Sequence, residues 1–258
     1  MFGFAGREYS GVRNVRSKTG ERRLDVALNA LASALRDVRG SWMIIGGIAV
    51  IARGVRRMTT DIDAVVLGEV IDPSNLLKIL ARHAVEPRIE QAAAFAKKNL
   101  VLLLRHRPSG VDLDVSLGWT DFEREAIASS TPAAYGRASY PMARAEDLVV
   151  FKALAARPKD IEDAAALILM HPSIDLARVR RRLVELAELA DEPELVEGLD
   201  QVVARTRAVR RAARKKAASK KPASKKPASK PGATKKAVRL GSAANHSEAQ
   251  ASRKSRLH

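Results

Sequence analysis

The pattern of apolar and polar positions predicts strands in the first half of the chain and helices in the second. Short apolar runs at 42–45, 61–67 and 100–105 are typical of buried strands. Residues 111–117 alternate strictly between apolar and polar, which predicts a strand with one buried face, and a Pro-Ser-Gly turn before them favours a hairpin. Apolar residues at helical spacing predict helices over 24–38, 48–53, 73–83, 91–98, 121–129, 146–157, 158–169, 174–190 and 192–214.

These elements predict an α+β fold. We expect a small mixed β-sheet with flanking helices, followed by a helical C-terminal half and a disordered basic tail. The expected bounds are a flexible arm at 1–20, a folded domain at 21–204 with its sheet core at about 40–120 and its helical part at about 121–204, and the helix end and tail at 205–258.

The net charge of +17 comes from the tail. From Arg205 to the end there are 18 of the 46 basic residues but one of the 29 acidic residues, Glu248, so the other 28 basic and 28 acidic residues cancel. The tail has few large apolar residues to offset chain entropy, so we expect it to be disordered. Such a tail either binds nucleic acid or another polyanion through counterion release or serves as a solubilising extension.

Composition excludes several kinds of site. The chain has no cysteine, so disulfides and thiolate metal sites are excluded. The longest apolar run, from Trp42 to Ala52, contains two glycines and is about half of the roughly 20 residues that a membrane-spanning helix needs. The N-terminus lacks the apolar segment of a secretory signal. We therefore expect a cytoplasmic protein that has no membrane partner.

Acidic residues on two predicted strands form a candidate metal site. Asp61 and Asp63 are separated by one residue, so strand alternation places both on one face, with Cα atoms roughly 6.6 Å apart. Two neighbouring carboxylates repel each other unless a cation lies between them, and Mg²⁺ prefers such hard oxygen ligands. Asp114 or Asp112, on the polar face of the strand at 111–117, offers a third carboxylate.

A glycine turn precedes the acidic strand. Gly46 and Gly47 lie between a predicted strand and a helix N-terminus, where backbone N–H groups can approach a phosphate closely. Arg56 and Arg57 stand before the acidic strand and can neutralise phosphate charge. An Asp-x-Asp pair or a Gly-Gly turn is common by itself, but their conjunction with a second acid-faced strand indicates phosphoryl or nucleotidyl transfer.

Three separated blocks, in order, resemble the nucleotidyltransferase superfamily of the DNA polymerase β-like fold, and most of all its bacterial branch of AbiEii-like toxins from type IV toxin–antitoxin systems. The resemblance covers roughly residues 24–200. Many family members have Gly-Ser where this chain has Gly46-Gly47, and the serine contacts the nucleotide phosphates. The blocks are GGIAVIARGVRRMTTDIDAVV at 46–66, VDLDVSLG at 111–118 and EDLVVFKALAARPKDIEDAAALI at 146–168.

The resemblance implies roles for individual residues. Asp61, Asp63 and Asp114 match the metal-binding aspartates, and Gly46 and Gly47 match the nucleotide-binding turn, with Arg57 as a nucleotide-binding candidate beside it. The implied cofactor is Mg²⁺ or Mn²⁺, and the implied substrate is a nucleoside triphosphate (NTP). The resemblance to toxin-like members also raises an antitoxin protein as a candidate partner.

Lys152 lies in an apolar helical segment, where its ammonium group must either reach solvent or find an anion. Asp160 follows the Arg157-Pro158 break and is either a helix-start residue or the partner of Lys152. The resembling family has a lysine followed by an Arg-x-Lys-Asp-x-x-Asp element here, which favours a catalytic role for Lys152 and Asp160.

The sequence thus indicates a Mg²⁺-dependent enzyme that transfers a nucleoside monophosphate from an NTP to a hydroxyl of RNA, protein or a small molecule, and it raises a toxin-like role. The alternative is a non-catalytic nucleic-acid-binding protein on a degenerate nucleotidyltransferase scaffold. The presence of all three carboxylates favours the enzyme.

Overall fold

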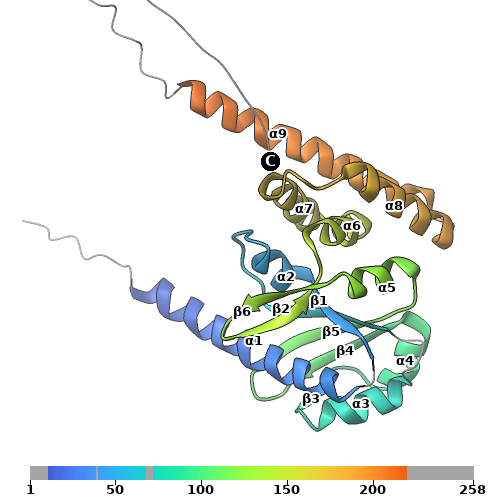
Figure 1. Ribbon diagram of the computed structural model, residues 1–258. Helices are drawn as coiled ribbons and strands as arrows, with labels where there is room; N and C mark the ends of the chain where they lie inside the picture. The colour runs from blue at the N-terminus through green and yellow to red at the C-terminus, as the bar shows by residue number, and fades with distance from the viewer. Residues whose placement is uncertain (1–10, 39, 68–71, 220–258) are drawn as a thin grey trace, which may run out of the picture. The chain divides into compact units, whose positions relative to one another are not determined.

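A mixed sheet of seven strands organises the described residues, which are 11–38, 40–67 and 72–219 of the computed structural model (Figure 1). The strand order is β3-β4-β5-β2-β1-β7-β6. Neighbouring strands are antiparallel except for β2 with β5 and β1 with β7. The strands are β1 (Trp42–Ile45), β2 (Asp61–Leu67), β3 (Val85–Pro87), β4 (Val101–His106), β5 (Val111–Gly118), β6 (Thr131–Tyr135) and β7 (Ala138–Met142).

Helices cover both faces of this sheet. Helix α1 contacts β2, β5 and α3 on one face, whereas α2 and α5 contact β2 on the other (Figure 1). The C-terminal helices α6–α9 follow the last strand, and α6 contacts α2. The helices are α1 (Gly11–Asp37), α2 (Gly46–Ala52), α3 (Pro73–Ala81), α4 (Ala92–Asn99), α5 (Asp121–Ala128), α6 (Ala145–Ala155), α7 (Pro158–Met170), α8 (Leu176–Ala190) and α9 (Glu197–Ser219), with a short 3₁₀ helix at Pro193–Val196.

Side-chain alternation in the central strands separates an apolar face from a polar one. Ile62, Ala64 and Val66 of β2 pair with Leu113, Val115 and Leu117 of β5, and all six are buried. The residues between them point to the α2 side of the sheet. The predicted fold class, the acid-faced strands and the β4–β5 hairpin are therefore confirmed.

The sequence pattern did not predict three of the strands, β3, β6 and β7. The sheet continues to Met142, so the predicted end of the sheet core near residue 120 is wrong. Pro132 and Pro141, with small neighbours, give β6 and β7 no apolar alternation, and β6 is an edge strand, where a proline costs no ladder hydrogen bond. Strand β3 is the other edge, and its three residues are too few to carry a pattern.

The two ends of the chain also differ from expectation. Helix α1 begins at Gly11, within the segment predicted to be a loose arm, because a formed helix continues through arginine, lysine and asparagine without an apolar stripe. Helix α9 continues to Ser219. The expected arm at 1–10 and the expected disordered tail beyond 219 lie outside the described residues. No helix in the described part is both long enough and apolar enough to cross a bilayer.

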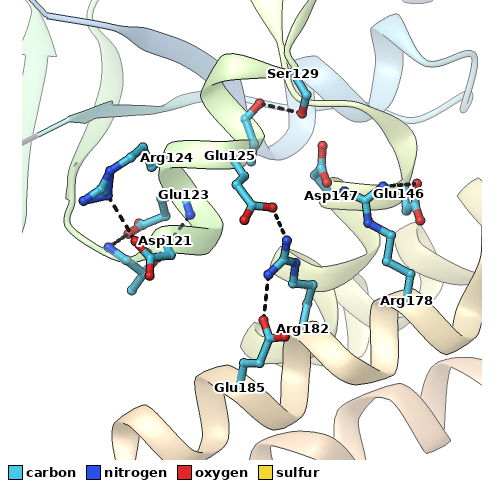
Figure 2. A network of polar contacts seen from close by, with 12 residues as sticks. Asp121, Glu123, Arg124, Glu125, Ser129, Glu146, Asp147, Arg178, Arg182 and Glu185 are labelled. Carbon is cyan, nitrogen blue, oxygen red and sulfur yellow. Dashed lines mark hydrogen bonds and ion pairs between the residues drawn. The ribbon is translucent and has the colours of Figure 1, made fainter.

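Charged residues tie the helical half to α5 (Figure 2). Arg182 of α8 pairs with Glu125 of α5 and donates to Glu185 over 2.7 Å. At the start of α6, Arg144 donates to Glu146 over 3.1 Å and lies 3.3 Å from the carboxylate of Asp147. Asp147 is buried, and this burial raises its pKa although Arg144 opposes the shift. Arg182 thus joins α8 to α5, whereas the contacts of Arg144 stay within the first turn of α6.

Two glycines provide a matched test of helix packing. A Cβ at Gly198 of α9 would lie 2.9 Å from the carbonyl carbon of Ala153 in α6, whereas a Cβ at Gly20 of α1 would meet no atom within 4 Å. We expect Gly198→Ala to lower the free energy of unfolding by about 1–3 kcal/mol through overpacking. Gly20→Ala should raise it by about 0.5–1 kcal/mol through helix propensity. Urea unfolding measures both, and a neutral Gly198→Ala would contradict the α6–α9 packing.

Candidate active site

Strand register brings the predicted carboxylates together. In the parallel β2–β5 pair, Asp63 lies directly opposite Asp114 and Asp61 lies opposite Asp112. Paired residues of neighbouring strands point to the same face, so these acidic side chains share the α2 side of the sheet. On the other side of β2, Ile45 pairs with Asp63, so the glycine turn that follows β1 begins beside this carboxylate.

Basic residues distinguish Asp112 from Asp114. Arg105 of β4 pairs with Asp112 in the register and donates to both of its oxygens, over 2.6 and 3.2 Å. Arg88, just after β3, donates to Asp114 and lies 3.5 Å from Asp112. Because Arg105 engages both oxygens of Asp112, Asp114 is the better third carboxylate of the two alternatives that the sequence offers.

The three carboxylates influence one another electrostatically. Burial raises the pKa of Asp63, and the negative charges of Asp61 and Asp114 raise it further. Burial also raises the pKa of Asp114 against the opposing charge of Arg88. Burial acts in the same direction on Asp61, but a hydrogen bond from Thr59, the charge of Lys159 and backbone hydrogen bonds from residues 60 and 61 together outweigh it and leave the pKa lowered. A cation beside Asp63 would relieve this repulsion.

The donor set suits a hard divalent cation, since it consists of three carboxylates on adjacent strands. Asp61, Asp63 and Asp114 are the residues that would hold it. Across the described ranges, no group of three or more histidine, aspartate or glutamate side chains is arranged as a metal site. All three have protein partners: Thr59 donates to Asp61 over 2.7 Å, Arg88 donates to Asp114, and the backbone N–H of Gly47 bonds Asp63. Their metal role stays a prediction.

The two glycines form the first turn of α2 and pack against the acidic strand. Gly46 has a φ of +61°, and a Cβ there would lie 2.5 Å from the carboxyl carbon of Asp63. The backbone N–H of Gly47 forms a hydrogen bond with Asp63, which acts to lower the pKa of that carboxyl. The turn therefore gives Asp63 the room and the donor that it needs. Phosphate binding by Gly46 and Gly47 stays a prediction.

Lys152 is buried and pairs with acidic residues of α7. Its ammonium group donates to Asp160 over 2.6 Å and lies 3.3 Å from Asp163. The alternative in which Lys152 reaches solvent is therefore wrong. Arg57, the predicted nucleotide-binding arginine, pairs with Asp163. Arg157 donates to the second oxygen of Asp160 over 2.5 Å, so the cluster contains three cations and two carboxylates.

This ionic cluster lies close enough to the carboxylates of the sheet to act on them. The charge of Lys152 acts to lower the pKa of Asp63, and Lys159 does the same for Asp61. The hydrogen bond to Asp160 raises the pKa of Arg157 against burial, and Asp61 and Asp63 add to the shift. The α6–α7 junction thus brings positive charge to the acidic face, as a phosphate-binding site requires.

A cavity of about 380 Å³ opens beside the carboxylates. Asp61, Asp112 and Asp114 line it together with Arg88 and with residues of α1, among them Arg23. The cavity is large enough to admit part of a substrate next to the acidic face. No pattern in the sequence marks the contributions of Thr59, Arg88 and α1. The Arg-Pro-Lys-Asp segment after α6 was the visible signal for Arg157 and Lys159.

Comparisons with known proteins give structural neighbours only. No family model matches the chain, and no curated protein matches it. The solution structure of the antibiotic-resistance factor ANT(2'')-Ia is similar, with 18% identity, a TM-score of 0.44 and coverage of 77% of this chain and 99% of that chain. The crystal structure of ANT(2'')-Ia in complex with adenylyl-2''-tobramycin shows 20% identity and a TM-score of 0.43 over 60% of this chain and 92% of that one.

A third similar structure is an antigenic nucleotidyltransferase-like protein from Paracoccidioides brasiliensis. It shows 20% identity and a TM-score of 0.40, and the match covers 70% of this chain and 93% of that chain. At these identities and TM-scores the likeness adds nothing to an argument about activity. The case for function therefore rests on the residues of the site.

The buried pair of Lys152 and Asp160 gives a pH-dependent prediction. Asp160→Asn should lower the free energy of unfolding at pH 7 by about 3 kcal/mol, because it leaves a buried cation without its anion. Burial alone would raise the pKa of Asp160, but Arg157 and Lys152 outweigh it and lower that pKa. The stabilisation is therefore present above the unfolded-state pKa of about 3.9 and is lost as the pH falls through the lower folded-state value.

Urea unfolding of the wild type and of Asp160→Asn checks this pH dependence. The measurements run from about pH 3 to pH 7, roughly the range over which carboxylates titrate. Asp200→Asn, which removes an exposed partner of Arg180, is the matched control and should cost less than about 1 kcal/mol. Equal losses in the two variants, or a loss in Asp160→Asn that does not shrink in acid, would show that the buried cluster is not what stabilises the α6–α7 junction.

Proposed function

We propose that this protein is a metal-dependent nucleotidyltransferase of the DNA polymerase β-like superfamily, with residues 21–204 as its catalytic domain. The observation that carries the proposal is the register of β2 and β5, which sets Asp63 opposite Asp114 with Asp61 on the same face. Asp61, Asp63, Asp114, Lys152 and Asp160 are the proposed catalytic set.

In the proposed reaction, an acceptor hydroxyl oxygen forms a bond to the α-phosphorus of an NTP. The bond between the α-phosphorus and the bridging oxygen breaks, pyrophosphate leaves with the electron pair of that bond, and the proton of the hydroxyl passes to solvent water. A bound Mg²⁺ or Mn²⁺ would supply charge neutralisation at the phosphates and would acidify the attacking hydroxyl. The carboxylates Asp61, Asp63 and Asp114 would hold this ion.

Basic side chains around the acidic face have different tasks. The side chain of Arg157 is 66% exposed and feels the charges of Asp61 and Asp63, so the part of its guanidinium that does not donate to Asp160 can contact phosphate oxygens. Lys152 is buried between two aspartates and holds the first turn of α7 in place. Arg57 is joined to the same cluster through Asp163, which places a guanidinium next to the glycine turn formed by Gly46 and Gly47.

The acceptor is a hydroxyl of RNA, of a protein or of a small molecule, and a toxin-like role with an antitoxin partner belongs to this proposal. The cavity beside Asp114 is where the acceptor hydroxyl would enter. The competing function is non-catalytic nucleic-acid binding on a degenerate scaffold. The complete carboxylate set argues against it, because a scaffold that had lost catalysis would have no need for three mutually repelling aspartates.

Asp114 and Asp112 make a matched pair for testing the activity. The purified protein is incubated with each labelled NTP, Mg²⁺ and either total RNA or lysate, beside Asp61→Ala/Asp63→Ala, Asp114→Asn and Asp112→Asn. We expect label transfer to fall at least about 100-fold in the first two variants, because metal stabilisation is worth several kcal/mol. Asp112→Asn should lose only several-fold, because Arg105 already engages that carboxylate.

Label transfer that persists in Asp61→Ala/Asp63→Ala would end the catalytic assignment. Equal losses in Asp114→Asn and Asp112→Asn would contradict the choice of Asp114 as the third ligand. Circular dichroism of each variant separates loss of activity from loss of fold.

The basic segment at 220–258 is proposed to bind nucleic acid or another polyanion. Its charge predicts an affinity that weakens steeply with salt, since each phosphate contact releases condensed counterions. Removal of residues 220–258 should abolish most salt-dependent binding to a labelled RNA in a filter assay. Transfer of label to a small acceptor should survive the truncation, and RNA binding that the truncation leaves unchanged would contradict the proposal.

A further inference from the structure

Thr59 lies between the glycine turn and the first aspartate of the acidic strand. It lies two residues before Asp61, the first residue of the acidic strand, and its hydroxyl donates to Asp61 over 2.7 Å. It lines the 380 Å³ cavity beside the carboxylates and a second cavity of about 470 Å³ on the side of β6 and α1. The first cavity also contains Asp114, and the second contains Arg57.

The Thr59 side chain also explains why position 47 is a glycine. A Cβ at Gly47 would lie 2.8 Å from the Thr59 Cβ and nearer still to its hydroxyl oxygen. Gly46, by contrast, combines a positive φ with a close approach to Asp63, whereas Gly47 does not have a positive φ. Position 47 therefore needs a glycine because of the space that Thr59 fills, and not because of its backbone conformation.

The side chain of Thr59 thus fits against the turn because position 47 has no side chain. The Thr59 hydroxyl has one donor, which it gives to Asp61, and two acceptor lone pairs. A β-branched residue has few rotamers, and here Gly47 forms the opposite wall, so the hydroxyl is held in one direction. Asp61 in turn has no freedom to rotate away from the acidic face without losing this donor.

We infer that Thr59 is a positioning residue that fixes the Asp61 carboxylate for cation binding, and that Gly47 is its obligatory steric partner. The inference rests on the proposed function, because it assigns Thr59 to the cation site formed by Asp61, Asp63 and Asp114. It also makes a separate claim about packing: a side chain at 47 and the threonine at 59 exclude each other.

The cation part is tested by Mn²⁺ binding without any nucleotide, measured by isothermal titration calorimetry. Thr59→Val keeps the shape but removes the hydroxyl, and we expect it to weaken Mn²⁺ affinity by about tenfold or more, as loss of a partner to a ligand typically does. Thr59→Ser should restore most of that loss. Thr60→Val is the matched control, because Thr60 is the neighbouring exposed threonine and lines the same two cavities. This variant should change the Mn²⁺ affinity less than about twofold, which is roughly 0.4 kcal/mol.

The packing part is tested by thermal unfolding of Gly47→Ser, Thr59→Ala and the double variant. Gly47→Ser alone should lower Tm by several degrees, because the new side chain overlaps Thr59. The double variant should recover most of that loss, since Thr59→Ala vacates the space. Additive Tm changes would overturn the steric partnership, and they do so whether or not the protein is an enzyme.

The outcomes separate the two levels of the proposal. Mn²⁺ binding that needs Asp61 and Asp63 but is unchanged in Thr59→Val would overturn the role of Thr59 and leave the proposed function standing. A wild-type protein that binds no Mn²⁺ and transfers no label would overturn the proposed function and the role of Thr59 with it. Weakened binding in Thr59→Val, rescue by Thr59→Ser and non-additive Tm changes would together support the inference.

Discussion

Like-charge crowding on one face of the sheet is the constraint around which the rest of the structure is arranged. Asp63 has Asp114 opposite it and Asp61 two residues away, and both of these raise its pKa on top of the effect of burial. Such crowding disfavours the folded state unless neighbouring groups compensate. Each neighbour of the acidic face supplies part of that compensation.

The compensation has a different physical form on each side. On the α2 side, Gly46 gives the Asp63 carboxylate room and Gly47 gives it an N–H donor. Directly after the edge strand β3, Arg88 donates to Asp114. From the helical half, Lys152 contributes a buried positive charge. The acidic face is therefore a product of the whole fold, and the sheet and the helical half depend on each other through it.

Lys152 links the site to the helical half. A buried lysine is costly unless anions pair with it, and Asp160 and Asp163 of α7 do so. The same Asp163 binds Arg57, which comes from the loop between α2 and β2. One ionic cluster thus fixes the loop, the end of α6 and the start of α7 together. Its geometry places the exposed guanidinium of Arg157 near the acidic face.

The sequence by itself determined the elements with strong periodicity. The alternation over 111–117 correctly assigned Asp112 and Asp114 to the polar face, and the spacing of Asp61 and Asp63 placed both on one face. Edge strands with proline and small residues, such as β6, carry no such pattern, because their side chains bury too little apolar surface to require one. The sequence likewise indicated a glycine turn, but it did not show that Gly46 makes room for Asp63 and Gly47 for Thr59.

Tertiary structure decided which of these residues meet. The parallel pairing of β2 with β5 joins segments that are separated by two helices and two strands, and no local pattern specifies that register. Arg105 distinguishes Asp112 from Asp114, and Thr59 fills the space beside Gly47; both facts depend on contacts between different elements. Sequence periodicity fixes the direction of a side chain within its own element, whereas the partner it meets depends on packing between elements.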